Sequence, residues 1–337
     1  MNTWNLLQNI WFVLIGVLLA GYSILDGFDL GIGTLFPFLA GNEEEKEKLV
    51  STIGPFWDGN EVWLLTAGGA LFAAFPQAYA TVFSGFYLAL MLVLFSLIFR
   101  AVSLEFRAHD PRRKKIWEWA FTLGSFLPAL FFGVALGNVL VGIPLNENMD
   151  FIGNFLTLIR PFPLAVGLLG CAAILLQGTT FAFLKNEGPL KIRAGRFSVT
   201  LLWIYTALLI LCFLLGLVYL PGAASKPTAW IFTVLILVSL GFLLAGLKKS
   251  REGWVFGASS TAFLGLWGIA GSVHYPYLVR ASNDLSLSLM ATNASSSELT
   301  LKVMLIIAIL GMPVVIGITV YLYRVFRGKI EEEKESY

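Results

Sequence analysis

Histidine, cysteine and charge are all scarce in this sequence of 337 residues. It contains two histidines and two cysteines, and charged residues make up 13% of it, about half the share found in soluble domains. Hydrophobic residues make up 57%. These proportions exclude a soluble globular protein and indicate a polytopic membrane protein.

The charge balance also excludes some partners. The net charge is +2, and no long run of basic residues stands out, so the sequence lacks the basic field that recruits nucleic acid. We therefore expect no nucleic-acid partner.

The few cysteines and histidines argue against a cofactor bound by this chain. Cys171 and Cys212 lie in long apolar runs, where a thiol serves as a small buried hydrophobe rather than as a disulfide or redox group. His109 and His274 are too few to hold several haems or a dinuclear metal centre. We expect no metal site, no cofactor-binding residues and no certain catalytic residue here.

A search for apolar windows of about 20 residues, the length needed to cross a membrane as a helix, finds nine spans. The sequence therefore predicts an all-α fold, a single integral membrane domain over residues 1–337. The connections are short, and the longest, residues 276–300, is polar and rich in Ser and Asn, so we expect no chemistry there. The predicted spans are residues 9–35, 55–75, 79–99, 117–141, 161–184, 198–220, 228–247, 254–275 and 301–323.

The distribution of Lys and Arg predicts the orientation. Nineteen of the 23 fall in alternate loops and the C-terminal tail, and the other four on the opposite side. Because cytoplasmic loops retain positive charge, we expect the N-terminus outside and the C-terminus in the cytoplasm of a bacterium with this chain in its inner membrane.

Four acids lie inside the predicted spans, where carboxylates are costly. Asp26 and Asp29 share one face of the first span, and Asp58 and Glu61 repeat this spacing in the second. With Trp11 as an anchor at the outer interface, Asp26 lies about 22 Å along the helix. Both pairs then lie near the cytoplasmic surface, on consecutive antiparallel helices. Such a cluster is suited to proton entry.

A structural role for these acids is equally open at this point. Asp58 stands where a carboxylate stabilises the start of a helix, and Asp26 or Asp29 could pair with Arg100 at the end of the third span. Trp57, beside Asp58, could shape the cluster or anchor the helix at the interface. Arg100 could equally be an electrostatic partner or a positive-inside anchor.

The glycines around the first acid pair favour helix packing. Gly27 and Gly31 form a Gly-x-x-x-Gly ridge, which lets helices approach closely. No predicted strand precedes them, as a dinucleotide-binding fingerprint would require.

Two function classes remain open from the residues alone: a proton-coupled transporter, or a subunit of a larger redox or proton-moving complex. A transporter typically shows internal repeats and matched broken helices. We find no clear repeat, which favours the subunit.

Two strings carry a family resemblance. Residues 26–33 (DGFDLGIG) and 54–65 (GPFWDGNEVWLL) closely resemble the first two helices of subunit II of cytochrome bd quinol oxidase. The resemblance continues through residues 66–74 and 83–87 and through Phe99 and Arg100, and it returns weakly in residues 295–301.

The resemblance implies a heterodimer that reduces oxygen to water with electrons from quinol. The partner, subunit I, would carry haem b and haem d. This chain would form two four-helix bundles plus one peripheral helix and would stabilise that partner in the membrane lipid. A structural quinone and a small single-helix accessory subunit are left open.

The resemblance also implies site residues. Asp58 is the first candidate for cytoplasmic proton uptake, followed by Asp29 and Asp26. Glu61 is weaker, since relatives can carry an amide there. Arg100 would be an electrostatic partner of these acids or a positive-inside anchor, and Trp57 is a supporting candidate from its position beside Asp58.

Overall fold

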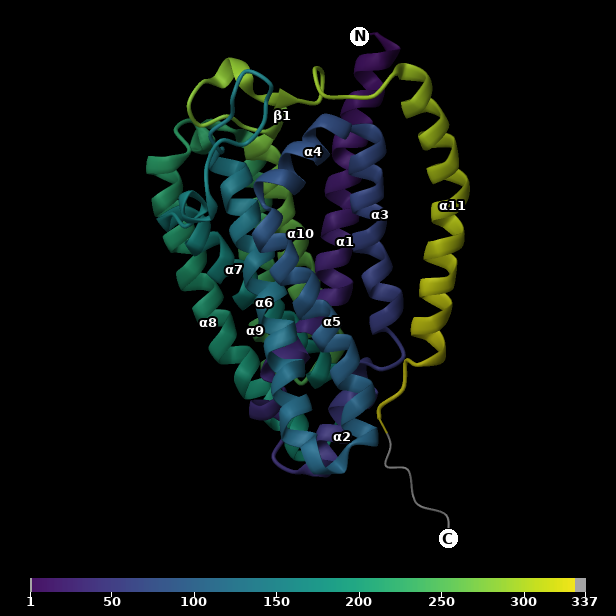
Figure 1. Ribbon diagram of the computed structural model, residues 1–337. Helices are drawn as coiled ribbons and strands as arrows, with labels where there is room; N and C mark the ends of the chain where they lie inside the picture. The colour runs from purple at the N-terminus through teal and green to yellow at the C-terminus, as the bar shows by residue number, and fades with distance from the viewer. Residues whose placement is uncertain (1, 331–337) are drawn as a thin grey trace.

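The computed structural model describes residues 2–330, and in them the chain is almost entirely helical (Figure 1). This confirms the predicted all-α fold. The α-helices are α1 (Thr3–Leu39), α2 (Glu43–Ile53), α3 (Trp57–Ala74), α4 (Pro76–Gly85), α5 (Tyr87–His109), α6 (Lys114–Val141), α7 (Pro161–Lys185), α8 (Gly188–Tyr219), α9 (Pro227–Lys248), α10 (Glu252–His274) and α11 (Glu298–Val325).

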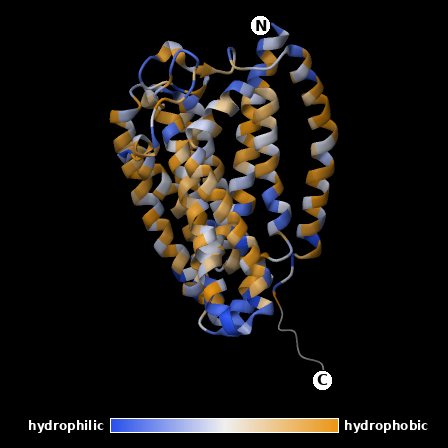
Figure 2. Cartoon of the chain, in the orientation of Figure 1, coloured by the Kyte–Doolittle hydropathy of each residue, from blue (hydrophilic) through white to orange (hydrophobic). Residues whose placement is uncertain are grey.

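Apolar residues cover the middle of the long helices, and polar residues gather at the two ends of the bundle (Figure 2). Within residues 2–330, eight helices are long and apolar enough to cross a membrane. The second predicted span, residues 55–75, is occupied by α3, which is not among the eight. Its 18 residues fall slightly short of the usual length, and Asp58, Asn60 and Glu61 fall in its first turns.

The third predicted span, residues 79–99, was wrong as one continuous helix. The chain forms α4 and α5 there, and Phe86 between them has the non-helical backbone angles φ −99° and ψ 16°. Gly85 lies at the break, and the Phe151 side chain packs against it. A Cβ at Gly85 would lie 3.0 Å from the Phe151 Cβ, so this packing favours a residue without a side chain.

Two helices extend well beyond the predicted spans. α5 continues ten residues past Phe99 to His109, and α8 begins ten residues before Ser198, at Gly188. The prediction ended each span at its first charges. In the structure, Arg100 and Arg107 are buried and paired with acids, so charge does not end the helix.

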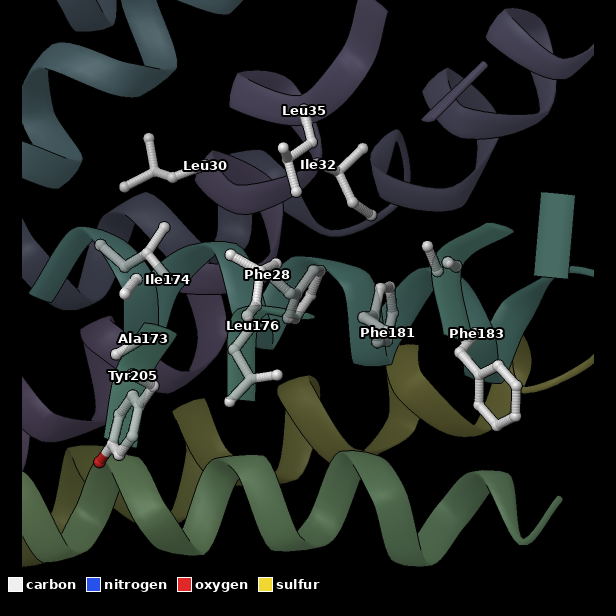
Figure 3. Close-up of a cluster of buried hydrophobic side chains, with 14 of the residues drawn as sticks. Phe28, Leu30, Ile32, Leu35, Ala173, Ile174, Leu176, Phe181, Phe183 and Tyr205 are labelled. Carbon is white, nitrogen blue, oxygen red and sulfur yellow. The ribbon is translucent and has the colours of Figure 1, made fainter. Parts of the chain in front are cut away.

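The main hydrophobic core surrounds α7, whose residues are largely buried. Figure 3 shows Phe28 of α1 beside Phe181 of α7, and the two rings stack with centroids 3.8 Å apart. Phe56 packs edge-on against both rings. Aromatic side chains therefore fill the space where α1, α7 and the start of α3 converge.

The crossing of α1 and α7 depends on two glycines. A Cβ at Gly31 would lie 2.9 Å from the Gly178 Cα, and one at Gly178 would lie 2.5 Å from the Gly31 carbonyl carbon. At Gly27 the nearest atom would be 3.8 Å away, an ordinary contact. Close packing by the predicted ridge is therefore confirmed at Gly31 and is not required at Gly27.

The polar loop between α10 and α11 is folded onto one end of the bundle. It contains an antiparallel pair of strands, β1 (Tyr277–Val279) and β2 (Leu289–Met290). Val279 and Leu289 are buried in a second hydrophobic core. Although its composition is polar, this segment caps the bundle.

The start of the last helix is joined to the first helix. Trp11 donates from Nε1 to the carbonyl of Leu301 (3.0 Å), and Gln8 donates from Nε2 to Ser295 Oγ (2.7 Å). Along the rest of its length α11 lies at the edge of the molecule (Figure 1), and Leu301 is its only buried residue. The two ends of the described chain lie at opposite ends of the bundle (Figure 1).

Candidate functional site

Arg100 on α5 lies at the centre of a buried charge cluster. Its side chain is 0% exposed, and Nη2 lies 3.0 Å from Asp26 Oδ1 while Nη1 lies 2.8 Å from Glu61 Oε1. The guanidinium carbon lies 5.9 Å from the centre of the Trp57 ring. One arginine thus joins α1, α3 and α5.

Close helix packing places Arg100 at this point. Gly124 of α6 lies against α5, where a Cβ would come within 2.8 Å of the Arg100 backbone nitrogen. With α6 this close behind α5, the arginine side chain extends toward α1 and α3, where the acids lie.

Asp29 joins the cluster through an asparagine. Its Oδ2 accepts a 2.7 Å hydrogen bond from Asn60 Nδ2, which also donates to the carbonyl of Leu25 (3.1 Å). The Tyr323 hydroxyl of α11 donates to Asn60 Oδ1 (3.4 Å). Asn60 therefore connects the acid of α1 to the peripheral helix.

Several buried polar atoms of the cluster have no hydrogen-bond partner among residues 2–330. They include Asp29 Oδ1 and Arg100 Nε, whereas the Tyr22 hydroxyl, one turn before Asp26 on α1, interacts with the Asp26 carboxylate. Buried polar groups are normally hydrogen-bonded, often through ordered water.

The composition of the cluster favours proton binding. Three carboxylates (Asp26, Asp29 and Glu61) face the single guanidinium of Arg100, so the fully ionised cluster carries two net negative charges. Uncompensated charge is costly in a region of low dielectric. Binding one proton would halve this excess charge, and binding two would remove it.

Comparison with known proteins identifies the family. The family model for cytochrome bd terminal oxidase subunit II matches residues 7–326. The cytochrome bd-I ubiquinol oxidase subunit 2 of Escherichia coli (strain K12) is 35% identical over 373 residues, covering 99% of this chain and 97% of the relative. The chain belongs to the cytochrome bd oxidase subunit II family. The resemblance seen in the sequence is thereby confirmed.

Two further comparisons agree with this membership. The cytochrome bd ubiquinol oxidase subunit 2 of Bacillus subtilis (strain 168) is 33% identical over 332 residues, covering 97% of this chain and 98% of the relative. The bd oxidase structure from Geobacillus thermodenitrificans has a TM-score of 0.80 at 16% identity, covering 95% of this chain and 98% of the matched one. At this low identity, the likeness to the Geobacillus structure concerns the fold alone.

Asp58, the first candidate of this subunit II sequence, lies apart from the buried acids. It is exposed on α3, and it makes no hydrogen bond or ion pair with any other residue in the range 2–330. Residues two apart on a helix point about 200° away from each other, so with Asn60 turned toward α1, Asp58 faces out of the chain. The structure brings together three of the four predicted acids.

The supporting residues lie close to the acids. Trp57 is half-buried beside the Arg100 guanidinium. Arg100 pairs with Asp26 and Glu61 rather than standing free at the membrane surface, so of its two interpretations the structure favours the electrostatic partner.

The two histidines of this subunit II chain lie on different helices, α5 and α10. His109 is exposed at the end of α5, with Nδ1 2.9 Å from the carbonyl of Glu105. His274 Nε2 lies 3.1 Å from the carbonyl of Leu278 in the folded loop. Across residues 2–330 no group of three or more His, Cys, Asp or Glu is placed to hold a metal ion.

Sequence reasoning missed Asn60, Tyr323 and Tyr22. Asn60 lies inside the string that carries the family resemblance, directly before Glu61, and a polar residue there in an otherwise apolar span was an available signal. Tyr323 gave no such signal, because only the fold brings α11 next to α3.

Proposed function

We propose that this chain is the subunit of a heterodimeric quinol oxidase that binds no haem, and that its carboxylates form part of a cytoplasmic proton uptake path. Haem b and haem d would belong to subunit I, and quinol would be the substrate of the complex. The chain would also stabilise subunit I in the membrane.

The observation that carries this proposal is the cluster of buried Asp26 and Arg100 with half-buried Glu61, and with Asp29 beside them. A purely structural ion pair balances its charges. Here the carboxylates outnumber the guanidinium, and Asp29 Oδ1 is buried without a partner among residues 2–330, which suits groups that exchange protons through water.

The proposed role of each residue in proton transfer follows from its position. Asp58, exposed on α3, would take up the proton at the surface of the chain, and Glu61 stands one helical turn further on. Asp26 and Asp29 would hold the proton deeper in the chain. Arg100 and Trp57 would keep the acids in place. Protons would then cross to subunit I.

The membrane arrangement is part of the proposal. α3 would be a ninth span in addition to the eight candidate helices, with the N-terminus outside and the C-terminus in the cytoplasm of a bacterial inner membrane. The first eight spans would form two four-helix bundles, with α11 peripheral. Lipid, a structural quinone and a single-helix accessory subunit would complete the surroundings.

The test is the Asp58→Asn variant of the whole oxidase, purified from membranes. An amide cannot hold the proton, so oxygen reduction and charge separation should slow by about tenfold or more, since positioned proton transfer contributes roughly 10²-fold or more to rates. Haem content, read from absorption, should stay unchanged. Asp150→Asn, the same change at an exposed site outside the cluster, is the matched control.

Full turnover by Asp58→Asn would refute its role in uptake. Loss of haem together with turnover would instead assign Asp58 to holding the two subunits together.

A further inference from the structure

A cavity of about 550 Å³ opens at the end of the bundle where α11 ends. It lies between the α2–α3 connection and the segment that follows α11, and Lys185, the last residue of α7, forms part of its wall. We propose that this cavity binds the headgroup of an anionic phospholipid, with Lys185 contacting the phosphate.

Lys185 is a buried cation without a carboxylate partner among residues 2–330. It is 5% exposed. Its ammonium donates to the carbonyls of Phe326 and Gly328, the latter at 3.1 Å, and lies 5.5 Å from the centre of the Phe56 ring. An ammonium has three N–H donors. Two of them are used by these carbonyls, so one remains for a ligand. A buried charge needs a counter-ion, and the cavity has room for one.

The charged groups around Lys185 leave an excess of positive charge. Lys329, also in the cavity wall, pairs with Glu252 at 2.6 Å, and Lys191 pairs with the same carboxylate. Among residues 2–330, Lys329 and Lys191 thus share one glutamate while Lys185 has none, which leaves an excess of positive charge. Basic pockets at the membrane surface between helices are suited to anionic headgroups.

The rest of the wall suits the apolar part of a lipid. Phe56, Val325, Phe326 and Ile330 line the cavity, and Val325 and Phe326 are 56% and 45% exposed. A free phosphate ion makes no use of such a surface. A phospholipid can place its phosphate on Lys185 and its acyl chains along the exposed apolar side of α11, and this favours the lipid.

The experiment uses the oxidase complex purified with its natural partners, with lipid binding followed by native mass spectrometry. Phosphatidylglycerol is titrated in detergent beside phosphatidylcholine. We expect the wild type to retain phosphatidylglycerol preferentially. Lys185→Gln should bind it about fivefold more weakly, the loss typical of one lysine near a membrane surface, whereas Lys185→Arg should retain most of the binding.

Two further variants separate the lipid site from a folding defect. Gly328 lines the cavity, and a Cβ there would meet nothing within 4 Å, so Gly328→Trp should fill the cavity and weaken binding while every charge remains. Lys249→Gln makes the same charge change at an exposed position at the end of α9 and should bind as the wild type does.

Three outcomes would overturn the proposal. The first is equal retention of phosphatidylglycerol by wild type and Lys185→Gln. The second is displacement of the lipid by millimolar inorganic phosphate, which would indicate a site for the free ion. The third is binding that occurs only after deletion of residues 331–337, which would show that the chain's own acidic end excludes lipid from the site.

Discussion

Arg100 joins carboxylates from two other helices at a point where none of its own side chain is exposed. Its fork of donors reaches Asp26 and Glu61 at the same time, which a lysine cannot reproduce. The arginine therefore fixes the positions of α1 and α3 relative to α5 as well as the local charge.

Replacing Arg100 by Met should lower the free energy of unfolding by about 3 to 5 kcal/mol, the usual cost of leaving a buried charge without its partner. The fall should appear as a lower Tm of the purified complex. Arg112→Met, in an exposed turn, is the control and should have little effect. Adding Asp26→Asn to Arg100→Met should restore part of the loss; an additive double variant would contradict this account.

How far the site could be predicted differs from residue to residue. Asp26, Glu61 and Arg100 were identified because charge inside a membrane span is rare and seeks a partner. The exposure of Asp58 and the burial of Asn60 could not be predicted, since both depend on how α3 is rotated about its axis. In a short helix with polar residues at 58, 60 and 61, composition does not determine that rotation.

At the scale of elements, the crossing of α1 and α7 brings backbone against backbone. Gly31→Ala should destabilise the protein by about 1 to 3 kcal/mol, the usual range for overpacking, because the new methyl group would meet the backbone of Gly178. Gly27→Ala, four residues earlier on α1 where space is available, should be nearly neutral. Equal thermal stability of the two variants would contradict this reading.

α2 is held to the bundle by ion pairs that depend on pH. Glu43 contacts Lys46 Nζ (2.8 Å) and Arg107 Nη2 (3.0 Å), and Lys46 also contacts Glu118 (2.9 Å). The hydrogen bond from Lys46, together with the positive charges of Lys46, Arg107 and Lys114, lowers the pKa of Glu43 below its ordinary value of 4.5.

A lowered carboxyl pKa sets the direction of the pH effect. The stabilisation by Glu43 should be complete above about pH 4.5 and lost as pH falls through its lowered pKa. Because the side chain is 56% exposed, the effect should stay below about 1 kcal/mol. The protection factors of the α2 amides, which are corrected for the intrinsic slowing of exchange in acid, should fall on acidification in the wild type and change less in Glu43→Gln. Glu47→Gln, exposed on the same helix, should behave as the wild type; equal acid sensitivity of Glu43→Gln would contradict the assignment.

The positions of the helices were more predictable than their ends. Apolar windows located α1, α6, α7, α9 and α10 well, because the membrane requires long apolar stretches. The ends of α5 and α8 were missed because charges that pair inside the protein can continue a helix. The break at Phe86 was missed because its packing partner, Phe151, is distant in sequence.

On the scale of the whole molecule, α11 contributes a long apolar surface that this chain leaves uncovered, since only Leu301 is buried. In a membrane, such a surface meets lipid or another subunit. Either covering would add stability that the isolated chain lacks.

Affinity purification of the full chain from its native membrane should bring down a haem-bearing membrane subunit, with the absorption bands of haem b and haem d. The physical reason is that two histidines on different helices are too few to hold several haems, so we expect the colour of the preparation to come from a partner. A stable, colourless homo-oligomer would contradict the oxidase subunit and return the transporter to consideration.

The junction between the first and last helices has a consequence for biosynthesis. The hydrogen bond from Trp11 to Leu301 spans 290 positions of sequence, so it can form only after nearly the whole chain has left the ribosome. The side chains of Gln8 and Trp11 therefore lack these acceptors until every intervening helix has been inserted. Closure of this end of the bundle is a late step of assembly. A chain that stops before α11 would leave these polar side chains of α1 exposed and without their acceptors.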